Sequence, residues 1–150
     1  MGIRLKRFPK HRLDFSIYSG VVTVEQVLRH FEKLEVGANW LSYFDPTADL
    51  SGIDLGHFPA LKRGLIAKEA ERDSDELRLC LLVNTASTNE DFVRFWCTYA
   101  AEGIEHPHQR DLCPTLEAAF DRLGLPDDVR AALAAELAPG EPVGAAAGRR

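Results

Sequence analysis

The chain has 150 residues, 45% of them hydrophobic and 27% charged, which is ordinary for a globular domain with a sizeable core. Its net charge of −5, from 18 basic and 23 acidic residues, disfavours general nucleic-acid binding, which needs a basic surface. No apolar stretch approaches the roughly 20 residues of a membrane span. The three cysteines show no Cys-x-x-Cys spacing, and we expect reduced thiols in a cytoplasmic protein.

The first elements are predicted to form a β-hairpin. Residues 3–8 and 13–18 have the pattern of strands on either side of a turn at 9–12. In the second strand apolar residues alternate with Asp14 and Ser16, so we expect that face to be exposed to solvent. The hairpin is placed at or near a sheet edge.

A helix and a buried strand are predicted next. Thr23 and Gln26 match the capping box, and an apolar stripe follows them as far as Leu34, before Gly37 ends the helix. Residues 39–45 are a nearly continuous apolar run, which is typical of a strand covered on both faces.

A polar loop over residues 46–57 is longer than most strand-to-helix connections. It leads into a helix over residues 58–70, whose buried side includes Leu61 and Leu65. Gly64 costs this helix about 1 kcal/mol relative to alanine, so we expect it to be held less tightly than its neighbours.

The next segment repeats the order of strand and helix. Residues 77–83 and 109–113 are predicted strands, and residues 89–102 between them are a predicted helix. The aromatic stripe of that helix consists of Phe92, Phe95, Trp96 and Tyr99.

Two further helices, over residues 115–123 and 126–137, precede a tail rich in Gly, Ala and Pro. We expect the tail, residues 139–150, to be disordered. Alternating strands and helices over residues 1–138 predict one α/β domain. It would have a mixed sheet of about five strands, with the hairpin at one edge and the inner strands parallel, and four to five helices.

This order resembles the SpoIIAA-like proteins, small bacterial α/β domains that share their fold with STAS domains, including anti-sigma-factor antagonists. The resemblance rests on segments 20–27 and 111–126, the strand end Phe44–Asp45, and the aromatic helix segment 92–96. It covers most of residues 1–126 and implies a SpoIIAA/STAS-like fold. For function we expect a cytoplasmic regulatory or interaction module.

The same resemblance leads to a phospho-switched antagonist as an alternative function. Residues 49–54, Asp-Leu-Ser-Gly-Ile-Asp, are similar to the first half of the antagonists' phosphorylation motif and place Ser51 in it. Leu55 stands where the phospho-acceptor serine of that motif is expected. The other reading of this segment is a turn stabilised by aspartate side chains.

Ligands of open α/β sheets bind beyond the carboxyl ends of the parallel strands. Five polar residues are predicted to lie there: Asp45, Ser51, His57, Asn84 and Thr85. Together with helix N-termini they could bind an anionic group, or they could serve as caps and turn formers.

A second hypothesis concerns the apolar faces of two predicted helices. We expect helices 58–70 and 89–102 to form a movable clamp for a lipid-like molecule, a partner helix or a second copy of the chain. The residues expected to line it are Leu61, Leu65, Phe92 and Trp96. The resemblance points the same way, because SpoIIAA-like folds are similar to small lipid-carrier domains of the CRAL-TRIO type.

Catalytic chemistry has weaker signals. His106 and His108 share one face of an extended segment and could bind a metal with a third ligand; otherwise they lie in an exposed loop. His57 and Asp54 fit either an acid–base pair or a cap. No catalytic motif or Gly-rich phosphate loop is complete, so we expect a non-catalytic module without cofactor. The alternative is a small metal-dependent enzyme or metal-binding protein.

Overall fold

The computed structural model describes residues 2–71, 77–100, 102 and 108–137. The predicted tail and His106 lie outside these residues. The chain divides into two compact units, residues 1–119 and 120–150. One domain over residues 1–138 stays a prediction.

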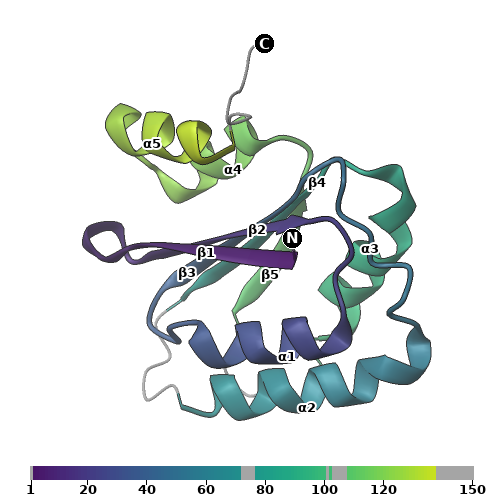
Figure 1. The fold of residues 1–150 in the computed structure, drawn as a ribbon. Coiled ribbons are helices and arrows are strands. Elements are labelled where there is room, and N and C mark those ends of the chain that lie inside the picture. Colours follow the sequence, from purple (N-terminus) through teal and green to yellow (C-terminus); the bar gives the residue numbers. More distant parts are fainter. Residues whose placement is uncertain (1, 72–76, 101, 103–107, 138–150) are drawn as a thin grey trace. The chain divides into compact units, whose positions relative to one another are not determined.

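The first unit is built on a five-stranded mixed sheet with the strand order β1-β2-β3-β4-β5 (Figure 1). The strands are β1 (Gly2–Phe8), β2 (Leu13–Ser19), β3 (Asn39–Phe44), β4 (Leu79–Asn84) and β5 (Gln109–Cys113). Strand β1 is antiparallel to β2, and the remaining neighbours are parallel. This confirms the predicted sheet with an N-terminal hairpin at its edge.

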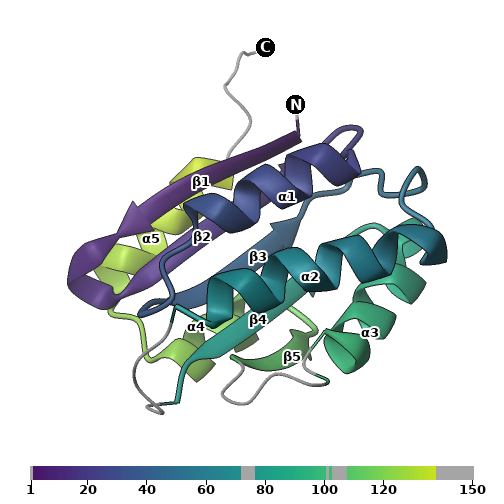
Figure 2. The same cartoon turned by 90° about the horizontal axis from the view of Figure 1, so that it is seen from below.

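Helices α1 (Val24–Lys33), α2 (Phe58–Glu69) and α3 (Glu90–Tyr99) cover one face of the sheet (Figure 2). They share a face because every crossover from β2 to β5 advances to the next strand in one direction, and such crossovers are right-handed. The predicted capping box is confirmed: Thr23 Oγ1 accepts the N–H of Gln26, whose side-chain oxygen accepts the N–H of Thr23. With α4 (Leu116–Leu123) and α5 (Asp127–Leu137), the described residues contain five α-helices.

The core of the first unit lies between the sheet and these three helices. Strand residues alternate between the two faces, so each of β2, β3 and β4 presents every second side chain to the helices. The helix-facing core residues of the strands are Tyr18, Trp40, Phe44, Cys80 and Leu82.

Asp14 and Ser16 also point to this face, and both are buried. The prediction that they face solvent was therefore wrong. Alternation along the strand was read correctly, but helix α1 lies over this face: His30 of α1 bonds to Ser16, and the N–H of Glu35, just after α1, bonds to Asp14. A polar residue in an alternating strand is a sign of exposure only when no partner is available to it.

The second unit contains the end of α4 and all of α5. Gly124 joins them with a positive φ of 62°, which glycine adopts without strain. Arg130 of α5 holds the turn, because its Nη1 lies 2.8 Å from Asp121 Oδ1 and its Nε donates to the carbonyl oxygen of Leu125 at 2.8 Å.

Among the described residues, no helix combines the length and the apolar character that crossing a membrane would require.

Candidate functional site

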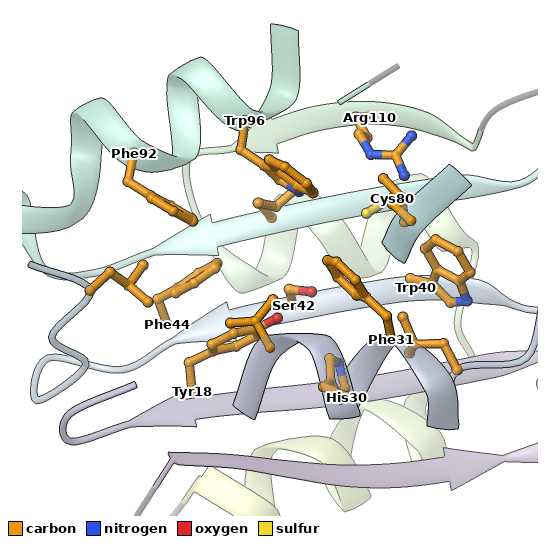
Figure 3. A pocket seen from close by; sticks show the side chains of 15 residues that line it. Tyr18, His30, Phe31, Trp40, Ser42, Phe44, Cys80, Phe92, Trp96 and Arg110 are labelled. Atoms are coloured by element: carbon orange, nitrogen blue, oxygen red, sulfur yellow. The ribbon is translucent and has the colours of Figure 1, made fainter. Parts of the chain in front are cut away.

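A small cavity lies between the sheet and the three helices of the first unit, and 15 residues line it (Figure 3). Its volume is about 40 Å³, which gives room for about three water molecules. Binding sites for small molecules usually measure about 300–1,000 Å³. The cavity is therefore closed around much less space than a typical ligand occupies.

The walls are mostly aromatic and aliphatic. Helix α1 contributes Val27 and Phe31, and α3 contributes Phe92 and Trp96, which are four residues apart and so lie on one helical face. The Phe31 and Trp96 rings from these two helices are nearly parallel, with centroids 6.0 Å apart. On the sheet side, the Tyr18 and Phe44 rings stack at 4.3 Å. Apolar ligands fit such walls.

The N-terminal end of helix α2 packs against helix α3. The Phe58 ring lies 5.2 Å from that of Phe92 and 4.9 Å from that of Phe95. Lys62 Nζ lies 4.3 Å from the centre of the Tyr99 ring and donates to the Tyr99 carbonyl oxygen at 3.0 Å. The predicted pairing of these two helices is thus present, and it closes one side of the helical layer.

Helix α2 also approaches α1 closely at Gly64. A Cβ atom at this position would lie 2.9 Å from Leu28 Cδ2, too close for an unshifted contact. Gly64 was expected only to weaken its helix. The structure gives it a packing role that the sequence of α2 alone does not reveal.

A buried charged cluster, formed by Glu69, His108 and Arg110, lies beside the cavity. Glu69 is the last residue of α2, His108 precedes β5, and Arg110 belongs to β5. At most 1% of each side chain is exposed. Arg110 Nη2 donates to Glu69 Oε2 at 3.0 Å, and Arg110 Nη1 donates to the His108 carbonyl oxygen at 2.8 Å.

The hydrogen bonds of His108 define its protonation. Its Nε2 lies 2.8 Å from the carbonyl oxygen of Ala38, which can only accept, so Nε2 carries a proton. Its Nδ1 lies 2.7 Å from Glu69 Oε1. Burial alone would raise the pKa of Glu69, but the hydrogen bond from His108 and the charge of Arg110 bring it below its ordinary value. Glu69 is then ionised, and Nδ1 of His108 must also donate.

The cluster consequently holds two cations and one anion. Trp40 stacks on the His108 ring, with centroids 3.5 Å apart and planes 12° from parallel, a geometry that favours a cationic imidazole. The Nε–H of Arg110 has no hydrogen-bond partner within the described part of the chain. Arg110 is also one of the residues that line the cavity.

A second polar cluster, formed by Arg7, Asp14, Ser16 and His30, lies on the same face of the sheet at the opposite end of the strand row that contains Arg110. Asp14 accepts from Arg7 Nε and from the Glu35 N–H, both at 2.8 Å. Ser16 Oγ lies 2.8 Å from His30 Nε2. Burial lowers the pKa of His30 to about 4, although nearby Asp14 opposes this, so His30 is neutral at pH 7.

The residues predicted at the strand ends form hydrogen bonds with nearby backbone groups. Asp45 Oδ1 accepts the Thr47 N–H at 2.7 Å, and Thr85 Oγ1 donates to the Phe44 carbonyl oxygen at 2.8 Å. Asn84 bonds within its own turn, and Asn89, which the sequence analysis did not select, ties this turn to the loop after β3. These side chains fix loops in place.

Ser51 and His57 also make local hydrogen bonds, Ser51 in a turn and His57 in a helix cap. The exposed Ser51 donates its N–H to Asp49 Oδ1 at 2.9 Å, and the hydrogen bonds from Ser51 lower the pKa of Asp49. His57 Nδ1 accepts the N–H of Asp54 at 3.1 Å. The Asp54–His57 pair is therefore a helix cap, one of the two alternatives that the sequence left open.

The structure separates the predicted site residues into two groups. Leu65, Phe92 and Trp96 line the cavity, and Leu61 is fully buried nearby without lining it. Asn84 and Thr85 instead border an open groove of about 480 Å³ at the ends of β4 and β5. The clamp hypothesis omitted helix α1 and Arg110 of the charged cluster, which also line the cavity.

Metal and thiol chemistry find little support. His108 was expected either to bind a metal or to lie in an exposed loop, but it is buried with both ring nitrogens engaged, which leaves none for a metal. No group of three or more His, Cys, Asp or Glu side chains among the described residues could hold a metal ion. Burial raises the pKa of Cys80 to about 12 and that of Cys97 to about 11, so both remain protonated and unreactive at pH 7.

Sequence reasoning missed the residues that make this cavity distinctive, Glu69, His108 and Arg110. Their only signal was a single arginine in a short strand whose helix-facing side is otherwise apolar. Comparison of the chain with protein-family models, with curated proteins and with solved structures gave no match.

Proposed function

We propose that the chain is a non-catalytic cytoplasmic binding module with a SpoIIAA/STAS-like fold, which takes up an apolar small molecule beneath helices α1, α2 and α3. The observation that carries this proposal is the aromatic cavity in the layer between sheet and helices. A lipid-like ligand fits these walls better than a polar metabolite, because transfer of its apolar surface from water is favourable.

Uptake requires the helical layer to move. The cavity is several-fold smaller than the sites that small molecules usually occupy. The contacts between helices α1, α2 and α3 that the structure shows are made by side chains, such as the Phe58 ring against Phe92 and Lys68 against the Glu32 carbonyl oxygen. The helices can therefore separate while the sheet hydrogen bonds stay intact.

The chemistry of the lining supports binding over catalysis. Cys80 carries a protonated thiol, and His30 is neutral and bonded to Ser16. The Tyr18 hydroxyl stays protonated because burial raises its pKa. The three cysteines are free thiols, which agrees with a reducing compartment.

Native mass spectrometry of freshly purified protein, followed by thermal melting with added 1-octanol, tests this proposal. A ligand that binds only the folded state raises the melting temperature with concentration. We expect a co-purified small-molecule adduct or a rise in melting temperature with octanol. A clean apo monomer that octanol does not stabilise would contradict the proposal, and a dimer or a bound peptide would point to a protein occupant.

Two matched variants locate the binding. Val27→Ile adds one methylene to a residue that lines the cavity, whereas Val24→Ile makes the same change one turn earlier on α1, outside the lining. Stabilisation by octanol should fall in the Val27 variant and persist in the Val24 variant. Equal stabilisation of both variants would place the ligand elsewhere.

A further inference from the structure

We propose that the occupant of the cavity carries a carboxylate head group, which accepts the free Nε–H of Arg110 while its apolar tail lies beneath the helices. This inference rests on the proposed function and adds the chemical class of the ligand. It is carried by one unpartnered donor, by the charge around it and by the position of both beside an apolar space.

The first observation is the unsatisfied donor. Arg110 is buried, and its two terminal nitrogens donate to Glu69 and to the His108 carbonyl oxygen. Its Nε–H alone has no acceptor within the described residues. Buried donors are almost always paired, because leaving one unpaired forfeits its hydration without replacement. An acceptor brought by a ligand would complete the set.

The second observation is the charge of the cluster. Arg110 and the doubly protonated His108 share the single carboxylate of Glu69, which leaves one positive charge without a counterion among the residues that the structure describes. Buried charges are normally compensated. A monoanionic head group supplies both the missing acceptor and the missing charge, whereas a cationic ligand would be repelled.

The third observation is position. Register pairs Trp40 with Cys80 and Cys80 with Arg110, so these residues form one row across β3, β4 and β5. Figure 3 shows this row at one end of the lining residues, with Phe44 and Phe92 at the other. A head group at Arg110 would therefore leave its tail pointing along the strands over apolar side chains.

The size and the number of free donors favour a carboxylate over a phosphate. A single N–H is available, and the space in the closed state is about 40 Å³. A phosphate brings more charge and three acceptor oxygens, and most of these would stay unpaired among aromatic rings.

Three probes with the same eight-carbon tail test the proposal on the intact chain: octanoate, 1-octanol and octylamine. Titration calorimetry of wild-type protein at pH 7 should rank them in that order. Octanoate should bind at least about tenfold more tightly than octanol, the factor expected for one charge-assisted hydrogen bond. In ¹H–¹⁵N spectra the Arg110 Nε–H resonance, assigned through its side-chain connectivities, should shift on addition of octanoate.

The variants Arg110→Lys and Arg94→Lys separate the head group from general charge. Lysine at 110 keeps a cation for Glu69 but has no Nε–H of arginine geometry, so the preference for octanoate over octanol should be lost. Arg94 lies on α3 and is exposed, and its variant should keep the preference. If the Arg110 variant fails to fold, the ranking of probes and the resonance shift in wild-type protein decide.

The outcomes distinguish this inference from the proposed function. Equal affinity for octanoate and octanol with an unmoved Arg110 resonance would overturn the carboxylate head group and leave the apolar site standing. Failure of all three probes to bind would overturn both. Persistence of the octanoate preference in a folded Arg110→Lys variant would also reject the role of Arg110.

Discussion

The two buried polar clusters of the first unit lie at opposite ends of one row of the sheet, and they are built differently. Register pairs Asp14 with Trp40, Trp40 with Cys80 and Cys80 with Arg110, so Asp14 on β2 and Arg110 on β5 flank the same apolar floor. At Asp14 an anion meets one arginine and a backbone N–H. At Arg110 two cations share one carboxylate, and one N–H has no acceptor among the described residues.

This difference teaches how to tell a structural polar cluster from a candidate site when both are buried. The Asp14 cluster is balanced in charge, and its contacts join β2 to the end of α1. Its role is therefore structural. The Arg110 cluster has an excess of charge and of donors beside a cavity. A buried network that is not complete by itself is where an external partner is expected.

The largest predicted effect is that of Glu69→Gln. Removing the carboxylate leaves the buried Arg110 guanidinium without its counterion, and breaking a buried pair in this way costs about 3–5 kcal/mol. Urea denaturation should show this loss. The control Glu71→Gln removes an exposed carboxylate 3.6 Å from Lys68 and should change stability by less than about 1 kcal/mol. A similarly small effect at Glu69 would mean that the cluster is not charged as described.

Lowering the pH should reduce the stability of the fold through His30, which belongs to the Asp14 cluster. Its pKa falls from an ordinary 6.5 to about 4 on folding, so the unfolded chain binds the proton more readily between these values. Stability is therefore fully present above pH 6.5 and decreases as pH falls toward 4, by about 3 kcal/mol in total. Glu69, whose pKa is also lowered, adds a loss only below about its ordinary value of 4.5.

Urea unfolding of wild type and His30→Gln from pH 7 to 4.5 measures this effect. Glutamine can still bond to Ser16 but does not titrate, so the variant should lose the decline above pH 4.5. Constant stability of the wild type between pH 6.5 and 5 would show that His30 is protonated without penalty in the folded state.

Much of the fold was predictable because its signals are local. The capping box at Thr23, the aromatic stripe of α3 and the apolar run of β3 each specify an element within a few residues. The predicted strand at 109–113 matches β5, whereas β4 begins at Leu79, two residues later than predicted, and Leu77 is exposed. The apolar cavity residues Leu65, Phe92 and Trp96 followed from the same helical periodicity.

The polar part of the site was not predictable, because it depends on three distant segments meeting. Glu69 ends a helix among other charged residues, where a glutamate is usually exposed. His108 and Arg110 lie about 40 residues later in the chain. Nothing local marks their burial, and the same reason explains why Asp14 and Ser16 were placed on an exposed face.

A smaller effect is expected for Asp14→Asn. The amide accepts fewer hydrogen bonds than the carboxylate, but Arg7 is 39% exposed and can turn toward water, so no cation is trapped. We expect a loss of about 1–3 kcal/mol by urea denaturation, below that of Glu69→Gln. Octanoate affinity should not change. A loss of octanoate binding in this variant would mean that the two clusters act together and are not separate in function.

The smallest effect is expected for Gly64→Ala, at the contact between α1, which carries His30, and α2, which carries Glu69. Gly64→Ala gains about 1 kcal/mol of helix propensity, but the new Cβ lies 2.9 Å from Leu28 Cδ2 and the end of that side chain must shift. The two terms should nearly cancel in urea denaturation. Gly64→Val cannot be accommodated by the same shift and should cost about 1–3 kcal/mol. A full stabilisation by alanine would show that α1 and α2 are not in close contact here, and that the helical layer above the cavity is looser than its packing at Gly64 indicates.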